Sequence, residues 1–354
     1  MKLFTIGPVE MFPETLAINA EQLPYFRTPE FSEIMLENEV LFRESICASR
    51  NDKVVFLTTS GTGAMEAAVI NCFTSNDRLL VINGGSFGER FGEICRIHKL
   101  LYDEVHLPFG EKLTRENLEP YYKKGYKGLL VNLHETSTGQ LYDIGMLAEF
   151  CRENDMYLIV DAIGAYGADE IDFKKYGIDV LIVSSQKALA LAPGAAVVVI
   201  SERIYRDKVT VTESGCLYLD FKQHIDNMER GQTPFTPAVG IFLSLNQRLK
   251  QIHNIGMKQM IKEVKELALK FRREAEEKGV KVPEYPLSNA LTPIIAEPYA
   301  EELYLGLKAE YGLMVTPNGG ELRQVLVRIG HLGNVRWEDY EELLEAMCEV
   351  KKRL

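Results

Sequence analysis

Two reactive side chains follow apolar runs in neighbouring parts of the chain. Asp161 comes directly after the run Tyr157–Val160, and Lys187, 26 positions later, follows the run Val180–Val183. A lysine held where a buried strand ends lies near low-dielectric surroundings, which favour its neutral, nucleophilic amine. Taken singly, each residue is more typical of a polar strand end or a solvated loop charge. The pair at the ends of two successive strands instead predicts a chemical site.

An amine and a carboxylate in this arrangement are the two fixed groups that a pyridoxal phosphate enzyme requires. The lysine forms a Schiff base with the aldehyde of the cofactor, and the carboxylate keeps the pyridine nitrogen protonated, so that the ring accepts electrons. We therefore predict pyridoxal 5′-phosphate as the cofactor, with Lys187 and Asp161 as the catalytic residues.

Three loops that follow other apolar runs carry groups that suit this cofactor. The segment Ser60–Gly63 opens a helical stretch, and free backbone N–H groups at such a start bind phosphate. Phe87, in segment 83–88, can lie against a flat ring. Hydroxyls of loop 134–139 can donate to a phenolic oxygen. Each loop has a structural alternative, namely a helix N-cap, core packing of Phe87 and an ST-turn.

The elements that must position these groups are short apolar runs that alternate with amphipathic stretches between residues 53 and 201. Such runs are typical of strands buried on both faces, and helical stretches such as 64–73 and 144–154 supply the crossovers that parallel strands need. Because parallel strands end at one edge of a sheet, the loops should converge there with Lys187. The last two runs lie too close together for a crossover helix and should pair antiparallel. The runs are Val54–Leu57, Leu79–Ile82, Leu129–Leu133, Leu158–Val160, Val180–Val183 and Ala195–Ile200.

The sequence pattern changes after Pro237, where the alternation of apolar runs and amphipathic stretches is no longer present. A long helical region extends from Val239 to about Lys278 and is interrupted at Gly256, and short strands and helices follow. We expect an α/β fold with a mostly parallel mixed sheet flanked by helices, plus a smaller α+β C-terminal domain. The expected division is an N-terminal segment near the active site (1–18), a large cofactor-binding domain (19–256) and a small domain (257–354).

Two further groups could bind anions. Arg328 is a charge inside an apolar strand-like segment, where an arginine usually pairs bidentately with a carboxylate. That carboxylate can belong to a substrate or, equally, to the protein itself. The turn Gly231–Pro237 precedes a helix and offers Thr236 to an anion.

Composition excludes several classes of function. The net charge of −11 argues against nucleic acid or an anionic membrane as the main partner. The six cysteines contain no C-x-x-C pair and the six histidines no H-x-x-x-H spacing, so we expect no metal site. The N-terminal apolar stretch is too short for a signal peptide and no segment reaches membrane-spanning length. The expected location is the cytoplasm.

On these residues the chain resembles the class V aminotransferases. This branch of the fold-type I pyridoxal phosphate enzymes holds alanine–glyoxylate, serine–pyruvate and 2-aminoethylphosphonate aminotransferases. The resemblance runs from Gly7-Pro8 to the Arg328 strand. Its most specific segments are Val160-Asp161-Ala162, Ser184–Lys187 followed by Pro193-Gly194, and Arg328-Ile329-Gly330. Because the family is dimeric, the resemblance implies a homodimer with active sites at the subunit interface.

The resemblance also implies a role for each candidate residue. The cofactor would be bound by Ser60, Gly61, Thr62, Phe87, Thr136, Ser137, Asp161, Ile163, Gln186, Lys187, Thr233 and Thr236. In this set, Phe87 and Ile163 would enclose the ring, Thr136 or Ser137 would reach its hydroxyl, and the two later threonines would serve the neighbouring subunit. The substrate would contact Gly7, Pro8 and Arg328.

The implied reaction is transamination from a small donor of the alanine or serine type to a 2-oxo acid such as pyruvate or glyoxylate. The alternative is a 2-aminoethylphosphonate–pyruvate aminotransferase, because Arg328 fits any α-carboxylate, including that of pyruvate. Two departures from the family pattern leave the substrate open: loop 83–90 is one residue longer than in the aminoethylphosphonate form, and Phe87 stands where many relatives carry Trp or Tyr. A cysteine desulfurase or related lyase is less favoured, since those enzymes usually carry His in place of Gln186 and need a mobile cysteine. The only cysteine beyond 216 is Cys348, inside a helical pattern. A cofactor-binding regulator or inactive homologue is disfavoured by the intact Lys187–Asp161 pair.

Overall fold

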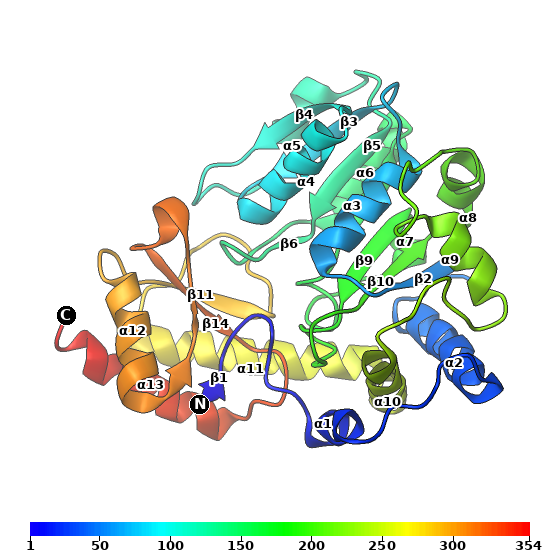
Figure 1. Cartoon of the computed structure of the whole chain (residues 1–354). Coiled ribbons are helices and arrows are strands. Elements are labelled where there is room, and N and C mark those ends of the chain that lie inside the picture. Colours follow the sequence, from blue (N-terminus) through cyan, green and yellow to red (C-terminus); the bar gives the residue numbers. More distant parts are fainter.

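The computed structural model describes residues 1–354, and its central element is a seven-stranded sheet (Figure 1). The strand order is β2-β10-β9-β8-β5-β3-β4, and β10 alone runs antiparallel to the others. The strands are β2 (Lys53–Leu57), β3 (Arg78–Asn83), β4 (Leu101–His106), β5 (Gly128–Asn132), β8 (Tyr157–Asp161), β9 (Val180–Ser184) and β10 (Ala196–Ile200).

The six predicted strands are all present, and the antiparallel pairing of β9 with β10 is confirmed. The seventh strand, β4, was not predicted. It lies at the sheet edge with β3 as its only neighbour, and its residues are mostly half-buried or exposed. An edge strand of this kind carries charged and polar side chains, so it lacks the continuous apolar run that identified the others.

The sheet is covered by helices on both faces because neighbouring residues of each buried strand point to opposite sides. In β8, Leu158 and Val160 join one apolar core, whereas Ile159 joins the other. The first core includes helices α2 (Pro29–Ser45), α6 (Ile144–Asn154) and α10 (Val239–Ile255). The second includes α3 (Gly61–Cys72), α4 (Ser86–Ile97) and α9 (Phe221–Met228).

This layered unit is called the sheet lobe below. Its shorter elements are α1 (Pro13–Ala20), α5 (Arg115–Leu118), β6 (His134–Glu135), β7 (Gln140–Leu141), α7 (Phe173–Tyr176) and α8 (Glu202–Ile204), with single turns at 119–121 and 205–209.

The last hundred residues build a second layer with a core of their own, called the C-terminal lobe below (Figure 1). A three-stranded sheet in the order β11-β14-β13 packs with its helices, and the N-terminal strand β1 (Lys2–Leu3) pairs in parallel with β12. The elements are α11 (Met257–Glu277), β11 (Leu291–Ile295), α12 (Ala300–Tyr311), β12 (Leu313–Met314), β13 (Thr316–Pro317), β14 (Leu326–Gly330) and α13 (Trp337–Lys351), with a turn at 320–322.

The long helical region is divided at Gly256, as the sequence predicts, between α10 and α11. The backbone φ of Gly256 is +87°, a conformation that favours glycine over residues with a side chain. Helix α11 buries only Ala268, Phe271 and Ala275, so most of its charged residues lie on a solvated face. Division of the chain into independent domains at residues 18 and 256 stays a prediction.

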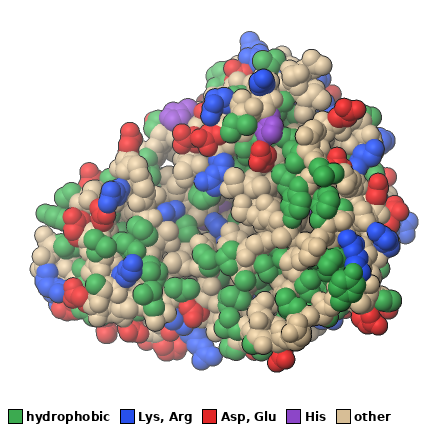
Figure 2. All heavy atoms as spheres, in the orientation of Figure 1, with side chains coloured by type: hydrophobic (Ala, Val, Ile, Leu, Met, Phe, Trp, Pro, Cys, Tyr) green, Lys and Arg blue, Asp and Glu red, His purple; other side chains and the backbone are tan.

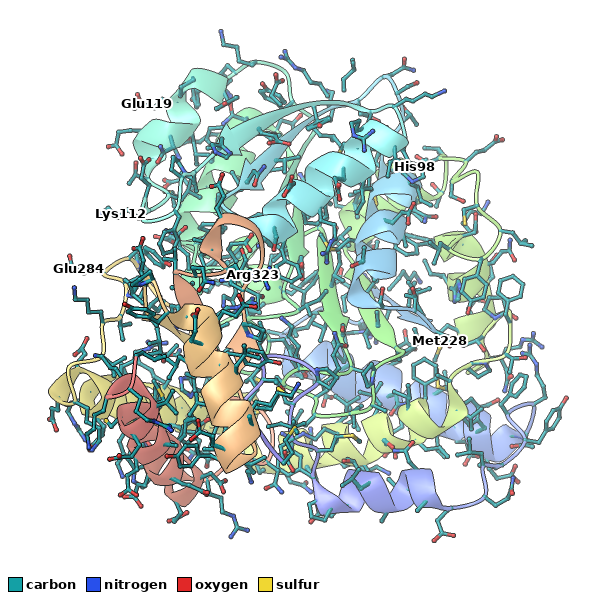
Figure 3. All side chains as sticks on the ribbon, turned by 60° about the vertical axis from the view of Figure 1, so that its left-hand side comes forward. His98, Lys112, Glu119, Met228, Glu284 and Arg323 are labelled. Atoms are coloured by element: carbon teal, nitrogen blue, oxygen red, sulfur yellow. The ribbon has the colours of Figure 1, made fainter.

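The two lobes also meet at loops outside α11. The ring of Phe109, in the loop after β4, lies edge-on to Tyr285 with ring centroids 6.2 Å apart. Figure 3 shows Lys112 and Glu284, which belong to the same two loops, at this junction. Acidic and basic side chains are interspersed over the face drawn in Figure 2, which is hollowed between the lobes. None of the helices is both long and apolar enough to cross a membrane.

Candidate active site

Six parallel strands send their carboxyl ends to the same edge of the sheet, and a cavity of about 290 Å³ lies there. Its walls come from the sheet lobe, the C-terminal lobe and the N-terminal segment. The lining residues are Ile6, Gly7, Ser60, Gly61, Thr62, Met65, Phe87, Arg90, Thr136, Asp161, Ile163, Gly164, Gln186, Lys187, Thr316 and Arg328. Eleven of these sixteen were predicted from the sequence, so the expected convergence of loops is observed.

Lys187 is the buried amine of this cavity. It lies in the turn after β9 and is 7% exposed. Its Nζ donates a hydrogen bond to Thr136 Oγ1 (3.2 Å) and lies 5.5 Å from the centre of the Phe87 ring. Burial lowers the pKa of Lys187 to about 8, although the negative charge of Asp161 acts to raise it. At pH 7 roughly one amine in ten is therefore neutral, against about one in three thousand for a solvated lysine.

Asp161 is the acidic counterpart of Lys187 at the end of β8. Its side chain is 5% exposed, and Oδ1 accepts a hydrogen bond from the backbone N–H of Ile163 (2.8 Å). Burial raises the pKa of Asp161 to about 6, while the Ile163 amide and the charge of Lys187 act to lower it. At neutral pH the two groups are thus mainly a carboxylate and an ammonium, and each favours the charged form of the other.

The start of helix α3 forms an anion cradle. The first-turn N–H groups of Gly61 and Thr62 have no preceding helical carbonyl to bind, and the helix dipole adds partial positive charge there. Ser60 is the N-cap, and its Oγ accepts from the N–H of Gly63 (3.4 Å). A Cβ at position 61 would lie 2.3 Å from Cδ1 of Ile163, so a side chain there would displace the end of Ile163, which lines the cavity. The close approach leaves the backbone open to a phosphate.

Two side chains of helix α4 face the cavity. Phe87 is half-buried near the helix start, and the guanidinium of Arg90 lies 4.8 Å from the centre of its ring. Arg90 also donates to Thr62 Oγ1 (3.1 Å), which connects α4 to the anion cradle. Arg90 was not predicted from the sequence, although it lies three positions after Phe87 and therefore on the same side of a helix.

Of the two residues in the loop after β5 whose hydroxyl could reach the cofactor ring, only one faces the cavity. Thr136 lines the cavity and contacts Lys187, whereas Ser137 does not line it. The Ser137 hydroxyl instead donates to the carboxylate of Glu135 and accepts from the N–H of Ser86 (3.2 Å). Only Thr136 is therefore placed to meet a ligand that reaches Lys187.

Arg328 reaches the cavity from β14 of the C-terminal lobe. It is 8% exposed, and its two terminal nitrogens donate to backbone carbonyls of Thr136 (3.0 Å) and Pro317 (2.6 Å). Its Nε is buried without a hydrogen-bond partner. Burial lowers the pKa of Arg328 to about 10, so the group stays cationic at neutral pH. A buried guanidinium with a free donor and no carboxylate partner is suited to a ligand carboxylate.

Four predicted residues do not line the cavity of the single chain. They are Pro8, which is exposed, Ser137, Thr233 and Thr236. The hydroxyl of Thr233 is engaged by the carbonyl of Phe235 (2.7 Å), whereas Thr236 is exposed on the surface. Two of the lining residues that were not predicted lie next to predicted ones. Met65 comes one helical turn after Gly61, and Gly164 directly follows Ile163. Ile6 and Thr316 carry no signal in the sequence, because tertiary packing alone brings them here.

The cavity fits a flat, phosphorylated aldehyde. It combines the anion cradle of α3, Phe87 and Ile163 as apolar walls, a buried amine and a buried carboxylate. The residues that would hold pyridoxal phosphate are Ser60, Gly61 and Thr62 for the phosphate, and Phe87, Thr136, Asp161, Ile163 and Lys187 for the ring. Gln186 is less free than expected, since its amide oxygen accepts from the hydroxyl of Ser184.

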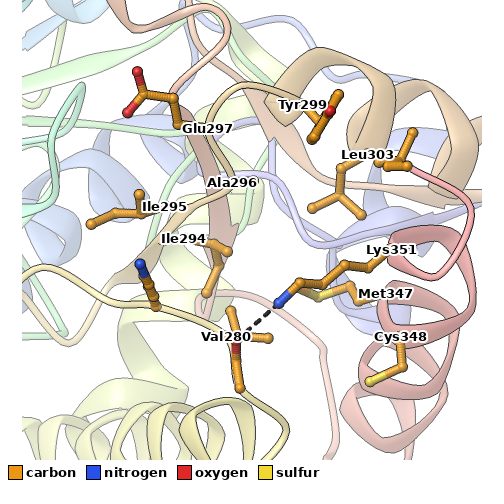
Figure 4. Close-up of a pocket in the computed structure, with 13 residues that line it drawn as sticks. Val280, Ile294, Ile295, Ala296, Glu297, Tyr299, Leu303, Met347, Cys348 and Lys351 are labelled. Atoms are coloured by element: carbon orange, nitrogen blue, oxygen red, sulfur yellow. Dashed lines mark hydrogen bonds between the residues drawn. The ribbon is translucent and has the colours of Figure 1, made fainter.

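A second cavity, of about 330 Å³, lies within the C-terminal lobe (Figure 4). Val280, Ile294 and Leu303 line it, and Lys351 donates to the carbonyl of Gly279 (2.9 Å) across one side. Cys348 faces this cavity and not the one at Lys187. None of the six cysteines lines the Lys187 cavity, and the structure contains no cluster of three side chains with metal-ligating groups.

Comparison with known proteins gives consistent matches along the whole chain. The family model described as Aminotransferase class-V matches residues 17–284. A relative named soluble hydrogenase, small subunit, from Synechococcus sp. is 29% identical over 98% of this chain and 92% of its own length. The alanine–glyoxylate aminotransferase of Oryctolagus cuniculus is 27% identical over 97% and 91%, respectively. The crystal structure of a subgroup IV aspartate aminotransferase from Thermus thermophilus superposes with a TM-score of 0.91, at 27% identity, covering 100% of this chain and 99% of that one.

The lowered pKa of Lys187 predicts the pH dependence of its reactivity. In the cofactor-free protein, we expect its modification by an amine-directed reagent to rise with pH through a midpoint near 8, because the neutral amine is the reactive form. Asp161→Asn removes the charge that raises this pKa, so the midpoint should move to lower pH. Mass spectrometry of the Lys187 peptide gives the rates, with the exposed Lys278 as internal reference. A midpoint near 10.5, the ordinary value, would contradict the burial argument.

Proposed function

Because the chain belongs to the class V aminotransferase family, we propose that it transfers the amino group of a small 2-amino acid, of the alanine or serine type, to a 2-oxo acid such as glyoxylate or pyruvate. The protein is a pyridoxal phosphate-dependent transaminase. The observation that carries the choice of substrate is the buried Arg328, which lines the same cavity as Lys187 and whose Nε has no hydrogen-bond partner within the chain.

Lys187 has two tasks in the proposed reaction. When bound, pyridoxal phosphate supplies an electrophilic carbon and an aromatic ring that accepts electrons. Lys187 would hold the cofactor through its Nζ. Once free, the same amine would act as the base that takes the proton from Cα of the donor, and as the acid that gives a proton back. A pKa near 8 suits both steps, because the amine can gain and lose a proton near neutral pH.

Asp161 and Arg328 fix the two ends of the reacting assembly. The ionised Asp161 carboxylate would hold a proton on the ring nitrogen, which is the role that its buried position beside a cation favours. Arg328 would bind the α-carboxylate of the donor through Nε and a terminal nitrogen, which orients Cα toward Lys187. Thr136 contacts both Lys187 and Arg328 and would set their separation.

The alternative donor, 2-aminoethylphosphonate, carries no carboxylate, so Arg328 would then bind the carboxylate of the acceptor. The lyase alternative is weaker, because a cysteine desulfurase requires a thiol that reaches the substrate. Cys348 faces the cavity of the C-terminal lobe instead.

We further propose that two chains form a homodimer with shared active sites. Thr236 is exposed, ahead of helix α10, where a partner chain could use it to complete the phosphate site. Thr233 is a weaker candidate, because its hydroxyl is already bonded within the chain.

We also propose that the enzyme is located in the cytoplasm, because six free cysteines suit a reducing compartment.

A half-reaction screen tests the proposed donor. Purified enzyme with bound cofactor is mixed separately with alanine, serine, aspartate and 2-aminoethylphosphonate, and the visible absorbance of the cofactor is followed. We expect alanine or serine to remove the absorbance fastest. Lys187→Ala should show no absorbance of the covalently held cofactor and no turnover. A spectrum that responds only to 2-aminoethylphosphonate would replace the proposed donor, and one that responds to none would refute it.

Substitution of Arg328 tests its role as carboxylate anchor. We expect Arg328→Lys to raise KM for the amino acid donor by ~10–100-fold, because a point charge replaces a bidentate fork, while the cofactor Kd changes less than about two-fold. Arg323→Lys is the matched control, since Arg323 is exposed and pairs with Glu301 at the surface. Collapse of cofactor occupancy in Arg328→Lys would show that Arg328 is structural.

Substitution of Thr236 tests the shared site. Light scattering should give twice the chain mass of 40.1 kDa, and Thr236→Ala should weaken cofactor binding by about ten-fold through loss of a hydrogen bond to phosphate. Thr210→Ala, at another exposed threonine, should leave cofactor binding unchanged. A monomeric enzyme with full cofactor affinity would contradict the proposal.

A further inference from the structure

Glu135 is a fully buried carboxylate just outside the cavity. It follows the strand β5 in the same loop as Thr136, and its exposure is 0%. Its hydrogen-bond partners are N–H groups and one hydroxyl, with no cationic side chain among them. Burial of an ionised group is costly, and this one is compensated by several donors at the positive end of helix α4.

The two carboxylate oxygens of Glu135 bind different sets of donors. Oε2 accepts from the N–H of Gly88 (3.1 Å) and from Asn132 Nδ2 (2.8 Å). Oε1 accepts from the N–H and the hydroxyl of Ser137 and, at 3.5 Å, from the N–H of Phe87. The carboxylate therefore joins the first turn of α4 to the loop after β5.

These two segments touch so closely that a side chain does not fit between them. A Cβ at position 85 would lie 2.3 Å from Ser137 Oγ and 2.7 Å from Cδ of Glu135. The N–H of Ser86 also donates to Ser137 Oγ (3.2 Å). Glycine at position 85 is thus what allows the carboxylate to reach α4.

Each of the two segments carries groups that face the cavity. The start of α4 carries Phe87, and Arg90 follows one turn later. The loop carries Thr136, whose hydroxyl accepts from Lys187 (3.2 Å) and whose carbonyl accepts from Arg328 (3.0 Å). Glu135 therefore fixes the position of the Phe87 ring relative to Thr136, the residue that contacts both the Lys187 amine and the Arg328 guanidinium.

We propose that Glu135 is a positioning residue that holds the aromatic wall at Phe87 in register with Thr136, and through Thr136 with Lys187 and Arg328. The identity of the bound ligands rests on the proposed function, but the coupling of the two walls does not. Glu135 touches neither cavity nor ligand and acts only through these neighbours.

The position requires a carboxylate, because both of its oxygens face donors. The amide of a glutamine presents an NH₂ group to one of the two sets, either to Gly88 or to Ser137. Asn132 could turn its own amide to meet that group, since its Oδ1 is buried without a partner, but the backbone N–H groups cannot invert. Glu135→Gln therefore keeps the volume and removes the acceptor of one of the two sets, which weakens the bridge.

Amide hydrogen exchange of the cofactor-free protein tests the coupling. In Glu135→Gln we expect the amides of Phe87, Gly88 and Ser137 to exchange at least ~10-fold faster, on both sides of the bridge at once. With pyridoxal phosphate added, the visible circular dichroism per bound cofactor should fall, because the ring is held in a less defined orientation. The matched control is Glu104→Gln, in strand β4, whose carboxylate accepts from Asn83 Nδ2 (2.8 Å) at the end of β3. That variant should leave both measurements unchanged.

A milder variant keeps the test decisive if Glu135→Gln does not fold. Ser137→Ala removes only the hydroxyl, and we expect a smaller increase of exchange at Ser86 and Phe87. Unchanged exchange in either folded variant, or a change confined to residue 137, overturns the proposal. Faster exchange at both segments in a protein whose wild type binds no pyridoxal phosphate would instead sustain the coupling and refute the proposed function.

Discussion

The desolvation of one amine is the constraint on which the rest of this structure depends. Lys187 is held in the turn after β9, where parallel strands end and water is largely excluded, and its charge is offset by the buried Asp161 at the end of the neighbouring strand β8. An ammonium in that position is costly unless an acid lies near it, and an acid there is costly unless a cation does. Each group therefore stabilises the charged form of the other. The pKa of each group nevertheless lies close enough to neutral pH for it to gain or lose a proton, as proton transfer requires.

Much of this arrangement could be predicted from the residues because it follows from local rules. Continuous apolar runs identify buried parallel strands, and a parallel sheet collects its strand ends at one edge. Lys187, Asp161, Phe87 and the Ser60–Thr62 turn were found in this way, without knowledge of how the loops pack. The family resemblance contributed Ile163 and Gly7, which no pattern of charge or hydrophobicity singles out.

The remainder could not be predicted because it depends on contacts between distant segments. Strand β4 has an ordinary polar sequence, and only its pairing with β3 makes it a strand. Thr136 and Ser137 are adjacent and chemically alike, yet one faces Lys187 and the other turns toward Glu135. Glu135 itself carries no sequence signal beyond being an acid in a hydroxyl-rich loop, since its role arises from the approach of α4.

The N-terminal segment connects the two lobes beside the site. Strand β1 pairs with β12 of the C-terminal lobe, and six residues further on the N–H of Val9 donates to the carbonyl of Gln186 (3.1 Å). Only a short stretch of backbone therefore separates the lobe that bears Arg328 from the turn that bears Lys187. This stretch is a tether that limits how far the guanidinium and the amine can lie from one another.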